Sequence, residues 1–238
     1  MYEKKVTVPE KGWNLSDLFH EIQEVSGEAA STWNASGEDL KEFGLMWVVV
    51  RYEVELSRKI LPGEELCFKT WALPFRHMMS QRNYLLFDGN GELLLSGAGI
   101  WAVVDRASRK MIEPSGCPVQ FQTEENEVKI SRPGQPVRVP IHKGSTYMVQ
   151  EADLDMNLHM NNTRYLSLAE SHVAECLKGK CPRQIRAGFQ NEARLGETIQ
   201  LNWGYQNHIQ YMSGMKNGTS CFEVSLLYEN DPQEEFAV

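Results

Sequence analysis

The feature that most constrains the fold is an internal repeat, in which an amphipathic helix pattern followed by β-rich runs occurs twice. In the first copy, apolar residues from Leu15 to Trp33 fall three and four positions apart, which is typical of a helix with one buried face. The β-rich runs that follow, separated by glycine-containing turn signals, are residues 45–56, 65–73, 81–87 and 92–104. The first copy therefore predicts one helix followed by an antiparallel meander.

The second copy repeats this order. Its helix is predicted from about Asn162 to Leu177, and its β-rich runs lie around Arg186, Thr198, Ile209 and Phe222. A hairpin signal at residues 61–66 has its counterpart at residues 194–199, whereas residues 34–44 are an extra segment of the first copy. A helix wrapped by one antiparallel sheet is the hotdog unit. We therefore predict an α+β chain of two tandem hotdog units.

A linker is predicted between the two units. Residues 113–140 are rich in proline, glycine and polar residues and show little periodicity. The prediction is thus an N-terminal unit at residues 1–112, a linker at 113–140 and a C-terminal unit at 141–238. The 238 residues are 42% apolar and 24% charged, a composition that is ordinary for a globular chain of two such units.

Charge and composition exclude several classes of function. The net charge of -8 argues against nucleic acid as a partner, because Lys and Arg provide most of that affinity. No run approaches the roughly 20 apolar residues of a membrane span, and the N-terminus lacks a signal-peptide pattern. The five scattered cysteines contain no C-x-x-C, so neither a disulfide framework nor a zinc site is signalled. We expect a cytoplasmic protein with reduced thiols.

The candidate chemistry precedes the second helix, where Asp155, Asn157 and His159 alternate with Met156, Leu158 and Met160. In an extended chain alternate side chains share a face, about 7 Å apart, so the apolar set would anchor in the core while an acid, an amide and an imidazole project together into a cavity. A carboxylate can act as base or nucleophile, an imidazole can act as acid or base, and an amide can orient a carboxylate or polarise a carbonyl. N–H groups of the next helix's first turn would suit a developing oxyanion. A half-buried strand without function shows the same alternation.

The motif resembles that of a known family. Residues 153–165, D-L-D-M-N-L-H-M-N-N-T-R-Y, resemble the D-L-D-x-N-x-H-x-N-N-x-x-Y motif of plant and bacterial acyl-acyl carrier protein (acyl-ACP) thioesterases. Residues 44–51 and 99–105 resemble the family's segments that enter and close the first sheet. The resemblance implies hydrolysis of fatty acyl-ACP to free fatty acid and carrier protein. The residues that it makes catalytic are Asp155, Asn157 and His159.

A second motif adds an acid. Residues 189–193, F-Q-N-E-A, resemble the family segment that carries a functional glutamate, followed in plant members by cysteine. The resemblance implies that Glu192 positions water or its partner, whereas Ala193 lacks the thiol of a Cys-His mechanism. Asp155 would be the base or nucleophile, oriented by Asn157, with His159 assisting proton transfer or carbonyl binding. Cys176 falls on the apolar stripe of its helix, and we expect it in the core.

The first unit is expected to hold the acyl chain, because residues 10–14 contain no counterpart of the catalytic motif. The even positions of residues 45–56 are all apolar, and the odd positions are apolar only at Leu45, Trp47 and Val49. This pattern predicts one face buried along the whole strand and the other buried only at its start. An acyl tunnel beside the helix explains this burial, and ordinary packing of the two units explains it equally well. The predicted substrate contacts are Phe19, Ile22, Met46, Trp47, Asn161 and Asn162.

The expected partner is an acyl carrier protein that carries a fatty acyl group. A basic patch for this acidic partner, or simply a solvated face, is predicted from Arg76, Arg82, Arg106, Arg109 and Lys110. We expect no metal, no organic cofactor and no nucleic acid. The rival functions are an acyl-coenzyme A thioesterase and a non-catalytic acyl-binding protein. The sequence leaves open the length and modification of the acyl chain, water attack or a covalent Asp155 intermediate, and a monomer or a homodimer.

Overall fold

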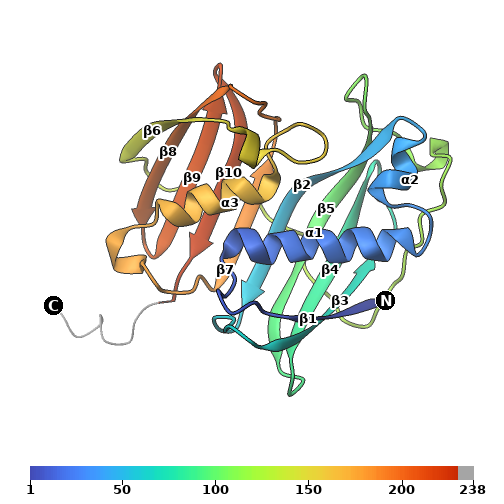
Figure 1. The fold of residues 1–238 in the computed structure, drawn as a ribbon, viewed down its shortest axis with the longest axis horizontal. Helices are drawn as coiled ribbons and strands as arrows, with labels where there is room; N and C mark the ends of the chain where they lie inside the picture. The colour runs from blue at the N-terminus through green and yellow to red at the C-terminus, as the bar shows by residue number, and fades with distance from the viewer. Residues whose placement is uncertain (230–238) are drawn as a thin grey trace. The chain divides into compact units, whose positions relative to one another are not determined.

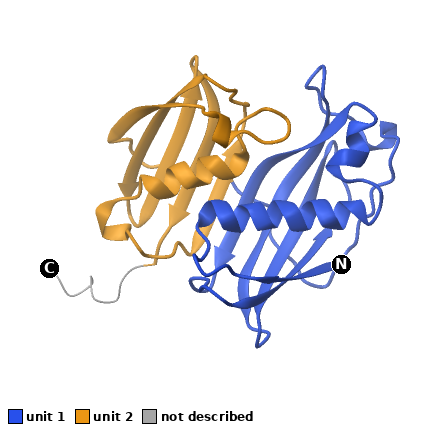
Figure 2. Ribbon diagram, in the orientation of Figure 1, with its two compact units in different colours: residues 1–134 blue, residues 135–238 orange. Residues whose placement is uncertain are grey.

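The computed structural model describes residues 1–229 and divides the chain into two compact units (Figure 2). Unit 1 is residues 1–134 and unit 2 is residues 135–238. The boundary falls inside the predicted linker. Residues 230–238, the end of the predicted C-terminal unit, lie outside the described residues.

Unit 1 is an antiparallel sheet with a long helix across one face (Figure 1). Along the sheet the strands follow the order β1-β3-β4-β5-β2, with every neighbouring pair antiparallel. The elements in chain order are β1 (Tyr2–Thr7), α1 (Leu15–Ser31), α2 (Gly37–Lys41), β2 (Leu45–Leu56), β3 (Glu65–Ala72), β4 (Met79–Asp88), β5 (Leu93–Asp105) and the 3-10 turn η1 (Pro114–Gly116).

Unit 2 repeats this topology with the strand order β6-β8-β9-β10-β7, again with antiparallel neighbours. Its elements are β6 (Lys143–Met148), η2 (Glu151–Asp153), α3 (Asn162–Ser171), η3 (Glu175–Leu177), β7 (Gln184–Phe189), β8 (Thr198–Gln206), β9 (Ile209–Lys216) and β10 (Thr219–Leu227). The corresponding strands occupy corresponding places, so the prediction of two tandem hotdog units is confirmed. The first strand of each unit, β1 and β6, was not predicted from the sequence.

The repeat extends to single hydrogen bonds in the predicted hairpin signals. In unit 1 the N–H of Leu61 donates to Glu64 Oε2 at 2.8 Å. In unit 2 the N–H of Arg194 donates to Glu197 Oε2 at the same distance of 2.8 Å. The glutamate side chain thus closes the equivalent turn in both units.

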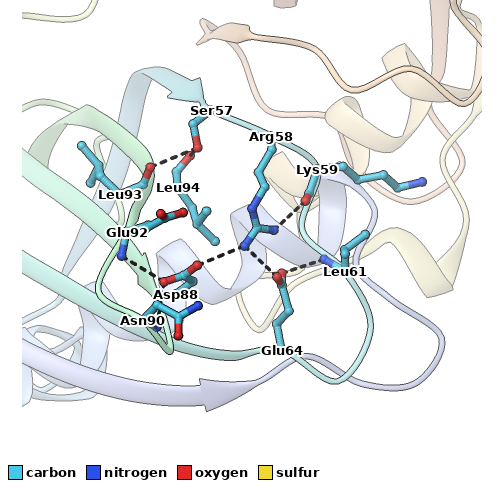
Figure 3. A network of polar contacts seen from close by, with 10 residues as sticks. All are labelled: Ser57, Arg58, Lys59, Leu61, Glu64, Asp88, Asn90, Glu92, Leu93 and Leu94. Carbon is cyan, nitrogen blue, oxygen red and sulfur yellow. Dashed lines mark hydrogen bonds and ion pairs between the residues drawn. The ribbon is translucent and has the colours of Figure 1, made fainter.

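A polar network joins two turns of unit 1 (Figure 3). Nη2 of Arg58 lies 2.7 Å from Glu64 Oε1 and 3.3 Å from Asp88 Oδ2. The other oxygen of Asp88 accepts the N–H groups of Asn90 and Glu92, each at 2.9 Å. Arg58 therefore links the β2–β3 connection to the β4–β5 turn, both of which were predicted from their glycines.

One face of helix α1 is buried in unit 1. Asn14 caps its N-terminus by accepting the N–H of Asp17 at 2.8 Å, as a capping box predicts. Its apolar stripe, which includes the fully buried Phe19 and Ile22, faces the sheet. None of the helices within residues 1–229 is long and apolar enough to cross a membrane.

Strand β2 carries a β-bulge. Val49 pairs with Trp101 and Arg51 pairs with Ile100, so Val50 is the additional residue. Because Trp101 and Ile100 are neighbours on one strand, they point to opposite faces of the sheet, and so do Val49 and Arg51. The predicted single face of even-numbered residues is therefore wrong.

The bulge separates residues that the alternation had grouped together. Tyr52 lies on the α1 face, where its ring meets Phe19 with centroids 5.2 Å apart. Trp47 shares this face, and its Nε1 donates to the carbonyl of Ala35 just beyond α1 at 2.8 Å. Met46 points to the opposite face. The helix stripe and Met46 therefore do not line one space beside α1.

The first part of the predicted linker packs against unit 1. Cys117, Val119 and Phe121 contact a cluster of α2 and the nearby strand ends. Farther on, the side chain of Gln81 donates to the carbonyl of Ile130 at 3.0 Å. The part of this segment near Ile130 thus partly covers the face of the sheet opposite α1, whereas Phe121 packs against Trp47 on the α1 face.

Helix α3 is shorter than the sequence pattern predicted. It ends at Ser171, and the N–H of Ala174 donates to the side chain of Gln210 at 3.0 Å instead of continuing the helix. Cys176 consequently lies in the separate turn η3 and is exposed. The expectation that Cys176 is a core residue is wrong, because the helix stripe on which it was placed does not reach it.

Candidate active site

The candidate site is built on the connection between β6 and α3 in unit 2. In unit 1 the equivalent connection, residues 8–14, is shorter and contains no acidic or imidazole motif. Asn161 caps α3 by accepting the N–H of Thr163 at 2.9 Å, the role that Asn14 has for α1. The extra residues of unit 2 form a loop in front of its helix, and this loop carries the predicted catalytic residues.

The loop is a tight turn and not the extended segment that the alternation predicted. The N–H of Asp155 donates to the carbonyl of His159 at 2.8 Å, and the N–H of Leu158 donates to the carbonyl of Asp155 at 3.0 Å. Leu158 has a φ of 63°, the left-handed conformation that such a reversal requires. Leu154 and Met160 then pair across the base of the turn.

The turn changes where the apolar residues of the motif lie. Met160, at its base, is buried as predicted. Met156 and Leu158, at the tip, are 75% and 71% exposed, so the prediction that they anchor in the core is wrong. In an extended strand, successive side chains point to opposite faces of the sheet. Where the chain reverses direction in a turn, the side chains at the tip are exposed to solvent.

The carboxylate of Asp155 is held by the backbone of its own turn. Its Oδ1 accepts the N–H of Asn157 at 2.8 Å and that of His159 at 3.4 Å. Its Oδ2 accepts no hydrogen bond within the described part of the chain. Asn157 therefore orients Asp155 through its backbone N–H, and the second carboxylate oxygen stays available to a ligand or water.

Tertiary structure brings His159 and Glu192 together, although they are far apart in the sequence. Nε2 of His159, which is buried, lies 3.0 Å from Glu192 Oε2 at the end of β7. The N–H of Met160 donates to the carbonyl of Ala193 at 2.8 Å, which docks the turn on this segment. Lys216 of β9 donates to the carbonyl of Glu192 at 2.9 Å and so fixes its backbone.

A buried acid that the sequence analysis did not assign fastens the base of the loop. Asp153 is 1% exposed, accepts the hydroxyl of Tyr147 at 2.6 Å and lies 2.9 Å from Arg164 Nε. Its carbonyl accepts the N–H of Asn161 at 2.8 Å. Burial alone would raise the pKa of Asp153, but the hydrogen bonds from Tyr147, the Gln150 N–H and Arg164 outweigh it and lower this pKa. Both Asp153 and Arg164 lie inside the D-L-D…T-R-Y motif, which was the available signal.

The start of α3 offers fewer donors than expected. The N–H of Thr163 is taken by the Asn161 side chain, and the N–H of Arg164 donates to the Asn161 carbonyl at 2.9 Å. The N–H of Asn162 has no hydrogen bond to any residue that the structure describes. The Asn162 N–H is therefore the group in this first turn that can still donate a hydrogen bond to an oxyanion.

The described site contains no thiol in a position to act as a nucleophile. Ala193, which stands where plant members of the family carry cysteine, is fully buried. Cys221 of β10 is buried as well, and burial raises the pKa of its thiol, so the thiol form is favoured over the nucleophilic thiolate. Within residues 1–229, no group of three or more His, Cys, Asp or Glu residues is arranged to hold a metal ion.

The predicted basic patch of unit 1 loses one member. Arg76, Arg109 and Lys110 are exposed and Arg106 is half-buried, whereas Arg82 is buried beneath α1. Arg82 belongs to the face of β4 that points toward the helix, so its place in a surface patch was a wrong prediction. The alternation of the strand, and not its charge, decides which way the side chain points.

Comparisons with known proteins agree with the geometry. The acyl-ACP thioesterase N-terminal domain family matches residues 7–114, and the acyl-ACP thioesterase C-terminal domain family matches residues 139–230. A chloroplastic acyl-(acyl-carrier-protein) hydrolase of Cuphea viscosissima is 27% identical over 183 residues, which are 69% of this chain. The alignment covers 44% of that relative, so the chain spans about half the length of the curated relatives it matches.

Solved structures have the same fold. An acyl-ACP thioesterase from Bacteroides thetaiotaomicron superposes with a TM-score of 0.80 at 19% identity, covering 96% of this chain and 97% of the other. The 12:0-ACP thioesterase from Umbellularia californica superposes with a TM-score of 0.78 at 14% identity, covering 97% of both chains. Two family models together match most of the residues, one in each hotdog unit. This chain belongs to the acyl-ACP thioesterase family.

Proposed function

We propose that the protein hydrolyses the thioester of fatty acyl-ACP to free fatty acid and carrier protein. The observation that carries this proposal is the His159–Glu192 pair, 3.0 Å apart, in which His159 comes from the same loop as the Asp155 carboxylate and Glu192 from the segment after β7. Family membership supports the reaction type. The carboxylate of Asp155 and the imidazole of His159 in one loop, with the carboxylate of Glu192 docked against it, are the groups that acyl transfer to water requires.

In the proposed reaction, water attacks the carbonyl carbon of the thioester. Asp155 accepts the proton of that water through Oδ2, while Oδ1 stays bound to the backbone. The tetrahedral intermediate collapses with cleavage of the C–S bond, and His159, paired with Glu192, donates a proton to the leaving thiolate. The Asn162 N–H is the candidate donor to the oxyanion. The products are a carboxylic acid and the thiol of the carrier.

A covalent route gives the same products. In it the Asp155 carboxylate attacks the carbonyl carbon, the thiol leaves, and water hydrolyses the resulting anhydride. A single turnover in ¹⁸O-labelled water tests the covalent route. Label in the protein at Asp155 supports the anhydride, since hydrolysis at the Asp155 side of the anhydride incorporates it there. Label in the fatty acid alone excludes hydrolysis at that side, and it arises either from direct attack by water or from hydrolysis at the acyl side.

We propose that the carrier protein binds the exposed basic residues at one end of the unit 1 sheet. Arg76 lies just before β4, while Arg109 and Lys110 lie just after β5. Because Met79 of β4 pairs with Ala102 of β5, these segments lie at the same end of the two strands. Acyl carrier proteins are acidic, so charge reversal at Arg76 should raise KM and weaken its dependence on salt.

The test of the whole proposal offers matched acyl-ACP and acyl-coenzyme A substrates over a range of chain lengths. Higher kcat/KM for acyl-ACP supports the proposal, and higher kcat/KM for acyl-coenzyme A supports the rival thioesterase. The absence of turnover with both series would favour a non-catalytic acyl-binding protein. The cytoplasmic location stays a prediction from the sequence.

A further inference from the structure

A charged side chain lies inside unit 1, beneath the helix. Arg82 of β4 is 8% exposed, and its guanidinium carbon lies 5.7 Å from the ring centroid of Trp33. Its Nη1 donates a long hydrogen bond of 3.4 Å to Thr70 Oγ1 on β3. The guanidinium carries five N–H donors, so one long bond leaves most of them available.

Arg82 has no carboxylate partner among residues 1–229. Its titratable neighbours are the phenols of Tyr84 and Tyr52, and burial raises the pKa of both. Burial lowers the pKa of Arg82, but arginine starts so high that it stays protonated at neutral pH. A buried cation without a counter-ion is unfavourable, and it is strongly stabilised by an anion that enters its surroundings.

Further polar groups lie on the same face of the sheet. The hydroxyl of Tyr84 lies 2.8 Å from Ser26 Oγ of α1 and accepts the indole N–H of Trp101 at 3.1 Å. A saturated hydrocarbon chain has no donor or acceptor that could form hydrogen bonds with these groups. The interior of the unit that we expect to hold the acyl chain is thus polar on the β4 side.

We propose that unit 1 binds acyl chains that carry an oxygen substituent, with a carboxylate as the best match, and that the Arg82 guanidinium donates to this oxygen. The inference rests on the proposed function, because it names the substrate class of the same enzyme. A carboxylate accepts two parallel N–H bonds from arginine and neutralises its charge, whereas a hydroxyl does only part of this.

Arg82 also has a structural explanation. Trp33 follows the C-terminus of α1, and the last turn of α1 contains no basic residue. A cation at that place stabilises the helix dipole whatever ligand is bound. This role predicts that loss of Arg82 lowers stability and affects all ligands alike, whereas the proposed role predicts an effect that depends on the oxygen of the ligand.

The experiment measures binding by titration calorimetry, which does not require hydrolysis. The ligands are three N-methyl dodecanamides, one unsubstituted, one with a terminal hydroxyl and one with a terminal carboxylate. We expect the wild-type protein to bind the carboxylate at least about 10-fold more tightly than the unsubstituted amide, the scale of a charged hydrogen bond. Arg82→Met should abolish this preference, Arg82→Lys should retain part of it, and the matched exposed control Arg132→Met should retain all of it.

Equal affinities for the three ligands in the wild-type protein would overturn the proposal without any variant, as would failure of all three to bind. A carboxylate preference that survives in folded Arg82→Met would also overturn it. Hydrolysis of saturated acyl-ACP, measured separately, distinguishes failure of the proposed role of Arg82 from failure of the proposed thioesterase activity. Hydrolysis without ligand preference refutes the role of Arg82 alone, and preference without hydrolysis of any acyl-ACP refutes the thioesterase activity.

Discussion

Arg164 of α3 lies 2.9 Å from the carboxylate of Asp153, at the other end of the candidate catalytic loop. This ion pair and the hydroxyl of Tyr147 tie β6, the base of the loop and α3 to one buried side chain. Asp155 is two residues away, so the position of its carboxylate depends on this anchor. We therefore propose that Asp153 is a positioning residue, distinct from the proposed catalytic residues.

The first prediction concerns this anchor. Asp153→Asn keeps the shape but removes the charge, and it should lower the unfolding free energy by roughly 1–3 kcal/mol, because the donors around it lose a charged acceptor. Because the pKa of folded Asp153 is lowered from about 3.8, its stabilisation is present above that pH and is lost as the pH falls through the folded value.

Urea titrations between pH 3 and pH 7 measure both effects, with the exposed neighbour Glu151→Gln as the matched control. A positioning role also predicts that kcat falls more than KM changes in Asp153→Asn. An unchanged unfolding free energy at pH 7 would contradict the anchor, and unchanged kcat would contradict its positioning role.

The second prediction concerns Asp155. Asp155→Asn should leave the melting temperature nearly unchanged, since the side chain bonds only within its own turn. Turnover should fall by about 100-fold or more, the scale of positioned acid-base catalysis. Acyl-ACP hydrolysis and circular dichroism together check this. Near-normal turnover in the folded variant would rule out the assignment.

The third prediction is that His159 and Glu192 act as a unit. Glu192→Gln and His159→Asn should each lower kcat by roughly 10-fold or more, and the double variant should lose much less than the product of the two effects. The double-mutant cycle on kcat/KM measures this coupling. Strictly multiplicative losses would mean that the 3.0 Å contact has no part in the reaction.

The fourth prediction is that no thiol takes part. Alkylation should modify the exposed Cys176 first and spare activity, because the buried Cys221 is protonated and no cysteine stands at Ala193. The measurement follows activity against the extent of modification by mass spectrometry. Inactivation that substrate prevents, in protein that stays folded, would disprove it.

The fifth prediction is that Trp47, and not Met46, borders the acyl chain. Trp47 lies on the α1 face and Met46 on the opposite one, so Trp47→Ala should shift preference toward longer chains by about 0.8 kcal/mol for each methylene newly buried. Met46→Ala is the matched control and should change kcat/KM equally at every chain length. The same length profile in both variants would place the chain elsewhere.

The sequence by itself determined the local structure and the repeat. The helix from Leu15, the turns at Gly63 and Gly91 and the four strands of the first meander follow from side-chain period and turn chemistry, which act over a few residues. The candidate catalytic residues were found because they lie together in two short motifs. These features need no knowledge of what packs against them.

Tertiary structure decided what depends on partners far along the chain. The pairing of His159 with Glu192 arises because the loop docks on the segment after β7. The bulge at Val50 is defined only by the register of β2 against β5, and it reverses the face of Met46. From the sequence Arg82 was assigned to the surface because it is charged, but the alternation of side chains along β4 places it under α1. Strand register and loop docking depend on contacts between segments that are far apart in the chain, so a pattern of neighbouring residues does not determine them.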